Sequence, residues 1–346
     1  MAYTTVNNGS LFMNPTLYTG NGSTQSITGV GFQPDFTWIK TRNDTQAHNL
    51  IDVVRGVTKT LECNEANAQF TDANGLTAFG SDGFTVGSSG GVNGSGDTLV
   101  SWNWKANGAG SANTAGSINS TVSVNTTSGF SIVTFTGTGA NATVGHGLGS
   151  VPKMIILKSY GGSTNWIVYH NSIGNGKALS LNTTAAESAD AGYFNSTTPT
   201  STVFSLGNDG FSNGNGQTMV AYCFAEKQGF SKFGQYSGNS SNDGTFVYLG
   251  FKPALIILKR TNSTGNWVMQ DNKRSSSGGF NQNQYTLYSN TGSDEITDES
   301  AVDFLSNGFK FRNAITDNNA NGSSYIYMAF AEAPLVGTNN IPANAR

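Results

Sequence analysis

Apolar and polar residues alternate along this chain in short runs that are typical of β-strands. Residues 130–136 mix apolar and hydroxyl side chains, which suits a strand with one half-exposed face. Runs of four apolar residues at 154–157 and 255–258 predict central strands buried on both faces, because they are too short for helices. Gly, Asn, Ser and Thr separate the runs, and Asp-Gly and Asn-Gly pairs predict tight turns. The pattern therefore predicts an all-β fold class.

The same pattern occurs three times. A Gly-x-x-Pro segment, followed by five mostly apolar residues and a lysine, begins at positions 31, 149 and 250. An aromatic-hydroxyl-Gly triplet precedes each copy, and an Asp/Asn-Gly-Phe turn and an apolar strand (98–104, 218–224, 324–330) follow it. Four landmarks recur in one order at intervals of about one hundred residues, so each copy is long enough for its own core. The landmark residues of the repeated segment are Pro34 and Lys40, Pro152 and Lys158, and Pro253 and Lys259.

The copies predict three tandem β-sandwich domains of jelly-roll type. We place repeat 1 at 10–106, repeat 2 at 120–227 and repeat 3 at 228–335. The Gly-, Ser- and Asn-rich residues 107–119 are predicted to be a flexible linker that leaves repeat 1 less tightly fixed than the other two. Residues 336–346 are predicted to be an irregular C-terminal tail.

Composition excludes several classes of protein. The 346 residues include 44 Gly and 40 Asn, and only 11% of them are charged. The net charge of −3 gives no excess of basic residues to bind the phosphates of a nucleic acid. The apolar runs are too short for membrane insertion. The N-terminus has no signal-peptide pattern, which predicts assembly in the cytoplasm. Two distant cysteines predict no disulfide framework.

In each repeat, the apolar segment that ends in the repeated lysine is called the lysine strand. Asp-x-x-Arg pairs follow the lysine strands of repeats 1 and 3, namely Asp52 with Arg55 and Asp271 with Arg274. Such pairs bind sugar hydroxyls well, but they also form structural ion pairs that hold loops, and this second interpretation is favoured. Repeat 2 has His170 at the aspartate position and no arginine partner.

Trp166 and Trp267 lie four residues before His170 and Asp271. An exposed indole stacks on sugars, whereas a buried one fills a sandwich core, and repetition at an equivalent place favours the core. The histidines do not cluster at ligand spacing, so no metal site is predicted, and no cofactor motif is present. Glu226 and Glu332 end equivalent strands without a second repeated acid, which argues against an enzyme.

Longer motifs carry a resemblance to a known family. These motifs are 31–40, 130–137, 144–158, 221–227, 231–238 and 329–337. They resemble a repeated protein common in marine tailed bacteriophages, whose members are described as virion structural or tail-fibre proteins. The resemblance covers nearly the whole chain and implies domains similar to concanavalin-like and laminin-G-like jelly rolls. It implies no catalytic residues.

We therefore expect a non-enzymatic protein of the virion surface, on the tail or the capsid, that recognises a host glycan as tail-fibre adhesins do. One alternative is a capsid or tail decoration protein that binds only other virion proteins. Another, less favoured, is a polysaccharide depolymerase. By analogy with phage fibres we expect a homo-oligomer such as a trimer, although three tandem domains can also build a pseudo-threefold monomer.

Overall fold

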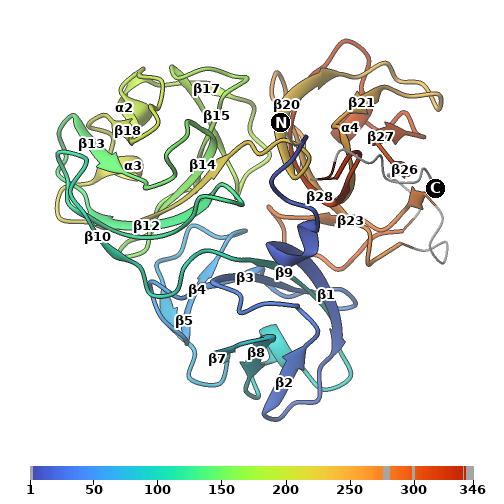
Figure 1. Ribbon diagram of the computed structural model, residues 1–346, viewed down its shortest axis with the longest axis horizontal. Helices are drawn as coiled ribbons and strands as arrows, with labels where there is room; N and C mark the ends of the chain where they lie inside the picture. The colour runs from blue at the N-terminus through green and yellow to red at the C-terminus, as the bar shows by residue number, and fades with distance from the viewer. Residues whose placement is uncertain (1–2, 276–280, 298–300, 338, 340–346) are drawn as a thin grey trace.

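The prediction of an all-β chain is confirmed. A computed structural model describes residues 3–275, 281–297, 301–337 and 339, and 45% of the chain is strand and 6% helix. Figure 1 shows three lobes around a common centre, which we call units 1, 2 and 3 in chain order. In the described residues, each unit contains one large and one small sheet, and no strand is shared between units. The predicted tail, 336–346, falls mostly outside the described residues.

Unit 1 packs a six-stranded sheet, in the order β1-β9-β3-β4-β5-β6, on a three-stranded sheet, β2-β8-β7. Its elements are η1 (Gly9–Leu11), β1 (Met13–Thr19), β2 (Gln25–Thr28), β3 (Phe36–Thr41), β4 (Asn49–Asp52), β5 (Lys59–Glu62), β6 (Phe70–Thr71), β7 (Leu76–Gly80), β8 (Gly83–Val86), α1 (Gly90–Asn93) and β9 (Thr98–Trp104).

Unit 2 packs an eight-stranded sheet, in the order β10-β11-β12-β19-β14-β15-β16-β17, on the pair β13-β18. Its elements are β10 (Ser111–Asn113), β11 (Ser120–Asn125), β12 (Phe130–Thr136), β13 (Ala142–Gly145), β14 (Pro152–Ser159), β15 (Ile167–His170), β16 (Lys177–Ser180), β17 (Ser188–Ala189), α2 (Ala191–Phe194), β18 (Val203–Leu206), α3 (Gly210–Asn213) and β19 (Thr218–Ala225).

Unit 3 packs a five-stranded sheet, in the order β20-β28-β22-β23-β25, on a four-stranded sheet, β21-β27-β26-β24. Its elements are β20 (Ser231–Ser237), β21 (Phe246–Tyr248), β22 (Phe251–Arg260), β23 (Trp267–Asp271), β24 (Gln282–Asn283), β25 (Leu287–Tyr288), β26 (Val302–Leu305), β27 (Gly308–Phe311), α4 (Thr316–Asn319) and β28 (Ser324–Pro334).

The last strand of each unit lies inside its large sheet, between two other strands. Strands β9, β19 and β28 each pair antiparallel on one side with the strand that leads into the aromatic-hydroxyl-Gly triplet, and on the other with the strand that contains the repeated lysine. The lysine strands β3, β14 and β22 are buried on both faces, as the continuous apolar runs predict. Pro152 opens β14, and Pro253 lies near the start of β22, where the register shifts. A proline fits there because it has no N–H to donate to the ladder.

The other faces of the three large sheets pack against one another and form a shared core. Trp104, Phe224 and Phe330 occupy equivalent positions on β9, β19 and β28 and meet as a triangle. The ring centroids of Trp104 and Phe224 are 6.4 Å apart, those of Trp104 and Phe330 5.8 Å, and those of Phe224 and Phe330 5.9 Å. The three units thus have a pseudo-threefold arrangement around a common apolar centre.

The segment predicted as a flexible linker, 107–119, contains a strand instead. Within it, β10 pairs with β11 and extends the large sheet of unit 2. The connection is fixed at its start by Asp35, whose carboxylate accepts the N–H groups of Ala106 and Gly108. Small polar residues carry no hydrophobic period, so the sequence pattern did not reveal this edge strand.

In each unit, one buried asparagine side chain holds neighbouring loops together through hydrogen bonds to their backbone. Asn93, Asn213 and Asn319 are the last residues of α1, α3 and α4, and each is fully buried. The Asn213 amide donates to the carbonyl oxygens of Ala140, at 2.6 Å, and Gly207, at 2.8 Å. Its oxygen accepts the N–H of the residue after Gly137. Asn93 and Asn319 make the same three hydrogen bonds in their own units.

A glycine faces each of these asparagine loops. A Cβ atom at Gly137 would lie 2.4 Å from the carbonyl oxygen of Gly214, and Gly20 and Gly238 are equally close to the corresponding loops. Only glycine permits this approach. The repeated aromatic-hydroxyl-Gly triplet therefore marks the place where the first strand of each repeat passes its asparagine loop.

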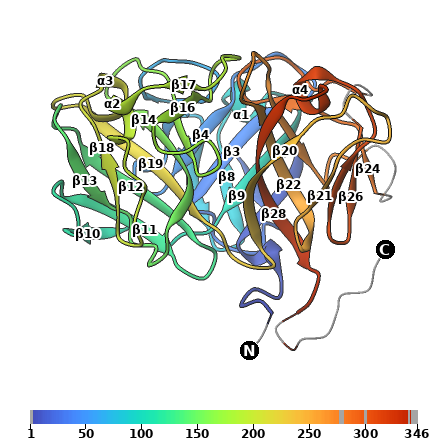
Figure 2. The same cartoon turned by 90° about the horizontal axis from the view of Figure 1, so that it is seen from above.

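The two faces of the assembly differ. Figure 2 shows α1, α3 and α4 on one side, and the start of the chain with the end of β28 on the other. On that second side, η1 packs on β28, where Gly9 lies against the carbonyl of Ala331, and Thr4 donates to the carbonyl of Gln228 at 2.7 Å. The N-terminal segment of unit 1 is therefore docked on unit 3.

We expect Asn213→Ala to destabilise the chain by about 2–3 kcal/mol, because it leaves three backbone groups without their partner. Equilibrium urea unfolding measures this change. Asn215→Ala is the matched control, since Asn215 is exposed in the same loop, and it is expected to change the free energy of unfolding by less than about 0.5 kcal/mol. Equal effects of the two substitutions would contradict the structural role of Asn213.

Candidate functional site

The seven residues singled out from the sequence all lie in the contacts between units. None of their side chains is more than 1% exposed, so none faces a solvent-filled cleft. They are Asp52, Arg55, Trp166, His170, Trp267, Asp271 and Arg274.

Asp52 connects unit 1 to unit 2. Its Oδ2 accepts hydrogen bonds from Nε of Arg55, at 2.5 Å, and from the hydroxyl of Tyr222 in unit 2, at 2.8 Å. Its Oδ1 accepts the backbone N–H groups of Val54 and Arg55, at 3.0 and 2.8 Å. The carboxylate is therefore fully hydrogen-bonded within the protein.

Asp271 connects unit 3 to unit 1 in the same way. Its Oδ2 accepts from Nε of Arg274, at 2.6 Å, and from the indole N–H of Trp102 in unit 1, at 2.9 Å. Arg274 also donates to Glu295 at 2.7 Å, and Glu295 pairs with Arg42 of unit 1 at 2.7 Å. An ion-pair network thus crosses this boundary.

His170 completes the set by connecting unit 2 to unit 3. Its Nδ1 accepts the N–H of Ser172, so its Nε2 carries the proton that is donated to the carbonyl of Tyr327, at 3.2 Å. The equivalent positions 52, 170 and 271 therefore join unit 1 to 2, unit 2 to 3 and unit 3 to 1. The Asp-x-x-Arg pairs and the unpaired histidine are variants of one contact around the shared core.

The residues four positions earlier form a second cyclic set, in the opposite direction. Each donates a ring N–H to a backbone carbonyl of the preceding unit in the cycle, at 3.0 Å. These donor and acceptor pairs are His48 with Tyr288, Trp166 with Glu62, and Trp267 with Ser180.

Two of the three repeated lysines also donate hydrogen bonds across these boundaries. Lys40, Lys158 and Lys259 are fully buried, and burial lowers the pKa of each to about 8. Lys158 donates to the carbonyl of Ala66 in unit 1, at 3.0 Å, and Lys259 to that of Thr184 in unit 2, at 3.1 Å. Lys40 bonds carbonyls of its own unit.

This placement favours the structural interpretation of all seven residues over the ligand-binding one. A sugar needs polar groups that water or ligand can reach, and these groups are already bonded to protein. Removing one partner of a buried charged pair leaves the other charge buried without a partner, which lowers the free energy of unfolding by about 3–5 kcal/mol. Their repetition therefore reflects repeated boundaries between units.

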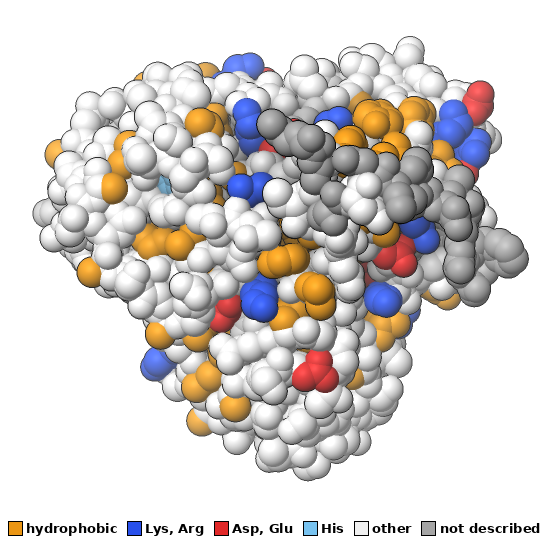
Figure 3. All heavy atoms as spheres, viewed as in Figure 1, with side chains coloured by type: hydrophobic (Ala, Val, Ile, Leu, Met, Phe, Trp, Pro, Cys, Tyr) orange, Lys and Arg blue, Asp and Glu red, His pale blue; other side chains and the backbone are white. Residues whose placement is uncertain are grey.

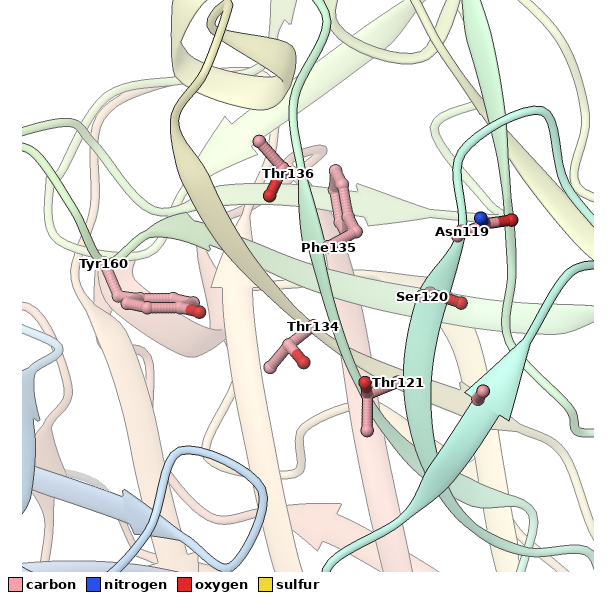
Figure 4. A pocket seen from close by; sticks show the side chains of 8 residues that line it. Asn119, Ser120, Thr121, Thr134, Phe135, Thr136 and Tyr160 are labelled. Carbon is pink, nitrogen blue, oxygen red and sulfur yellow. The ribbon is translucent and has the colours of Figure 1, made fainter.

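A different group of residues forms an open pocket on the large sheet of unit 2. The pocket has a volume of about 360 Å³, and none of its lining residues is charged. Figure 4 shows the hydroxyl of Tyr160 pointing toward Thr134, with Thr121 nearby. The lining residues are Ala112, Asn119, Ser120, Thr121, Thr134, Phe135, Thr136 and Tyr160.

The sequence pattern does not predict this pocket. The available signal was weak: hydroxyl residues alternate with apolar ones in 130–136, and Tyr160 follows Lys158 by two positions. Two further pockets, of about 420 and 320 Å³, differ because they include charged side chains. The first contains Glu226 and Lys232, and the second contains Lys273 and Glu332.

The acidic residues that end equivalent strands make local contacts. Glu226 accepts the N–H of Phe233 at 3.4 Å, and Glu332 pairs with Lys252 at 2.9 Å. Within the described ranges, no three His, Cys, Asp or Glu side chains come close enough together to hold a metal ion.

The three histidines predict a pH dependence of stability. Burial lowers the pKa of His48, His146 and His170, and for His170 it falls to about 4. The unfolded chain, with histidine pKa values of about 6.5, binds more protons than the folded chain below that pH. The stabilisation is therefore fully present above pH 6.5 and is lost as the pH falls toward 4.

We expect His48 and His170, whose pKa values are lowered furthest, each to decrease the free energy of unfolding by about 1 kcal/mol per pH unit between pH 6.5 and 5. Urea unfolding at several pH values measures this slope. His170→Gln keeps an N–H donor but cannot titrate, so it should reduce the slope by the share of one histidine. A stability that does not change over this range, or an unchanged slope in the variant, would contradict the buried neutral state.

Three comparisons with known proteins were made. No curated protein and no solved structure matches the chain. Among the described residues, no helix is long and apolar enough to cross a membrane. A family model described as "Domain of unknown function (DUF7483)" matches residues 8–334, a single span that includes all three units. The chain therefore belongs to the DUF7483 family.

Proposed function

We propose that this chain is a non-enzymatic protein of a bacteriophage virion surface that recognises a host glycan, as tail-fibre adhesins do. One observation carries the proposal: buried charged and aromatic residues join the three units, and the exterior is left largely to uncharged polar groups. Only 11% of the residues are charged, and Figure 3 shows charged side chains scattered singly over a mostly uncharged surface on the face that carries η1. Neutral hydroxyl and amide groups suit recognition of sugars better than recognition of ions.

The acidic residues support a non-enzymatic role over a depolymerase. A glycosidase needs two carboxyl groups facing each other across an accessible cleft. Asp52 and Asp271 are buried in ion pairs, and Glu332 is paired with Lys252. These carboxylates are therefore occupied by structural contacts.

The geometry also suggests which face meets the host. The asparagine loops after α1, α3 and α4 lie on one side, and η1 with the end of β28 lies on the other. In the proposal, the side with η1 faces the virion and the loop side faces outward. One chain already supplies three lobes, so the proposal works with a monomer as well as with the trimer expected by analogy.

A second function, decoration of the virion, is favoured by one feature of unit 3. Strand β21 is an edge strand, and its Phe246 and Tyr248 are 43% and 50% exposed. Exposed aromatic residues on an unpaired edge are suited to contact with another protein. Binding of a virion neighbour there is compatible with glycan recognition elsewhere.

We expect immunogold electron microscopy of virions that contain this chain to place it on the tail. The purified protein, added in excess to host cells, should reduce adsorption of the same virions, because both compete for one receptor. Labelling of the capsid lattice without any effect on adsorption would favour decoration. Absence of the chain from intact virions would contradict both functions.

A further inference from the structure

We propose that the pocket formed by β11, β12 and Tyr160 is a subsite for one ring of a neutral sugar, a hexose or an N-acetylhexosamine. This inference rests on the proposed glycan recognition and locates the glycan-binding site in unit 2. We call this pocket the β11–β12 pocket, with the lining residues given above.

The strands at the pocket's edge of the sheet, β10 and β11, are an addition specific to unit 2. In units 1 and 3, the strands equivalent to β12 are β1 and β20, and both end their sheets. In unit 2, β11 and β10 continue the sheet beyond β12, with Thr121 directly opposite Thr134. The pocket therefore lies on a surface that the other two units lack.

The pocket lies where the shared core ends. Alternate residues of β12 face the shared core, and Phe130 and Ile132 are buried in it. Thr134 and Thr136 point to the same side, because side chains alternate along a strand. They are only partly buried or exposed, so the apolar face of the sheet becomes a polar surface there. The next residue, Gly137, contacts the loop after α3, which places the pocket toward the proposed outward face.

The polar groups of the pocket have hydrogen-bonding capacity to spare. In the part of the chain that the structure describes, the side chains of Thr121, Thr134, Thr136 and Tyr160 make no hydrogen bond. The Asn119 amide, at the rim, also has no partner there. Hydroxyls donate and accept, and the amide does both, so together they match the mixed donors and acceptors of sugar hydroxyls.

Tyr160 supplies an aromatic surface for the ring. Its backbone is fixed by two hydrogen bonds, from its N–H to the carbonyl of Thr218, at 2.9 Å, and from the N–H of Gln69 in unit 1 to its carbonyl, at 3.0 Å. A tyrosine combines an apolar face with a polar tip, which suits the C–H face and the hydroxyl edge of a sugar. A volume of about 360 Å³ lies at the small end of ligand pockets and suits a short ligand.

The equivalent positions in the other units exclude a similar site there. Arg42 replaces Tyr160 in unit 1 and is paired with Glu295, and unit 3 has Thr261. Thr134 corresponds to Leu17 in unit 1. The absence of any charged residue from the β11–β12 pocket selects a neutral ligand over an acidic sugar.

The test is an array of neutral and sialylated oligosaccharides probed with the full chain, followed by titration of the strongest neutral binder. Three variants are compared: the double substitution Thr121→Val with Thr134→Val, Tyr160→Ala, and Tyr160→Phe. Valine keeps the branched shape of threonine and removes only the hydroxyl. The matched control is Phe211→Ala, which removes an exposed aromatic ring of α3 in the same unit that is not among the residues lining the pocket. Thermal unfolding confirms that each variant is folded.

We expect the wild-type chain to bind a neutral oligosaccharide. The double variant and Tyr160→Ala should bind it at least about tenfold more weakly, Tyr160→Phe should lose less, and Phe211→Ala should match the wild type. Neutral-glycan binding that the pocket variants leave intact would overturn this inference while the proposed function stands. Binding of sialylated glycans alone would also overturn it. No glycan binding by the wild-type chain would contradict the proposed function itself.

Discussion

The rest of the structure depends on the apolar contact between the three large sheets. Each sheet buries one face inside its own sandwich and the other against its neighbours, and Trp104, Phe224 and Phe330 meet where the three faces converge. A sheet with two apolar faces is unstable in water unless both are covered. A single unit would leave its second face exposed, so the three sandwiches stabilise one another.

The hydrogen bonds at the boundaries follow from this packing. Polar groups that are buried between units must find partners, because an unpaired buried donor or acceptor is costly. The chain meets this requirement with repeated positions whose partners lie in the next unit: 52, 170 and 271 in one direction around the centre, and 48, 166 and 267 in the other. Such directional bonds fix the rotation of each unit, which apolar contact alone does not.

The sequence predicted the strands and most of the repeat, because both depend on local pattern. The Asp-Gly-Phe landmark of unit 2 was wrong: it begins α3, whereas the matching motifs of units 1 and 3 lead into β8 and β27. The apolar runs at 154–157 and 255–258 are central strands, and the prolines and lysines of the repeat occupy equivalent places. The pattern did not predict what the buried positions pack against. The sequence pattern around Trp166 is the same whether its side chain packs inside its own sandwich or against another unit. Only the fold shows that its indole N–H donates to the backbone carbonyl of Glu62 in unit 1. Strand β10 and the pocket beside it were missed because Ser, Ala, Asn and Thr give no hydrophobic signal.

The central claim is that the three units fold as one body around the shared core. Differential scanning calorimetry of the whole chain tests it most directly, because the ratio of calorimetric to van't Hoff enthalpy reports the size of the cooperative unit. We predict a single transition with a ratio close to one. Two or three separable transitions, each with the enthalpy of about one hundred residues, would contradict the account, because they would mean that each sandwich is stable without its neighbours.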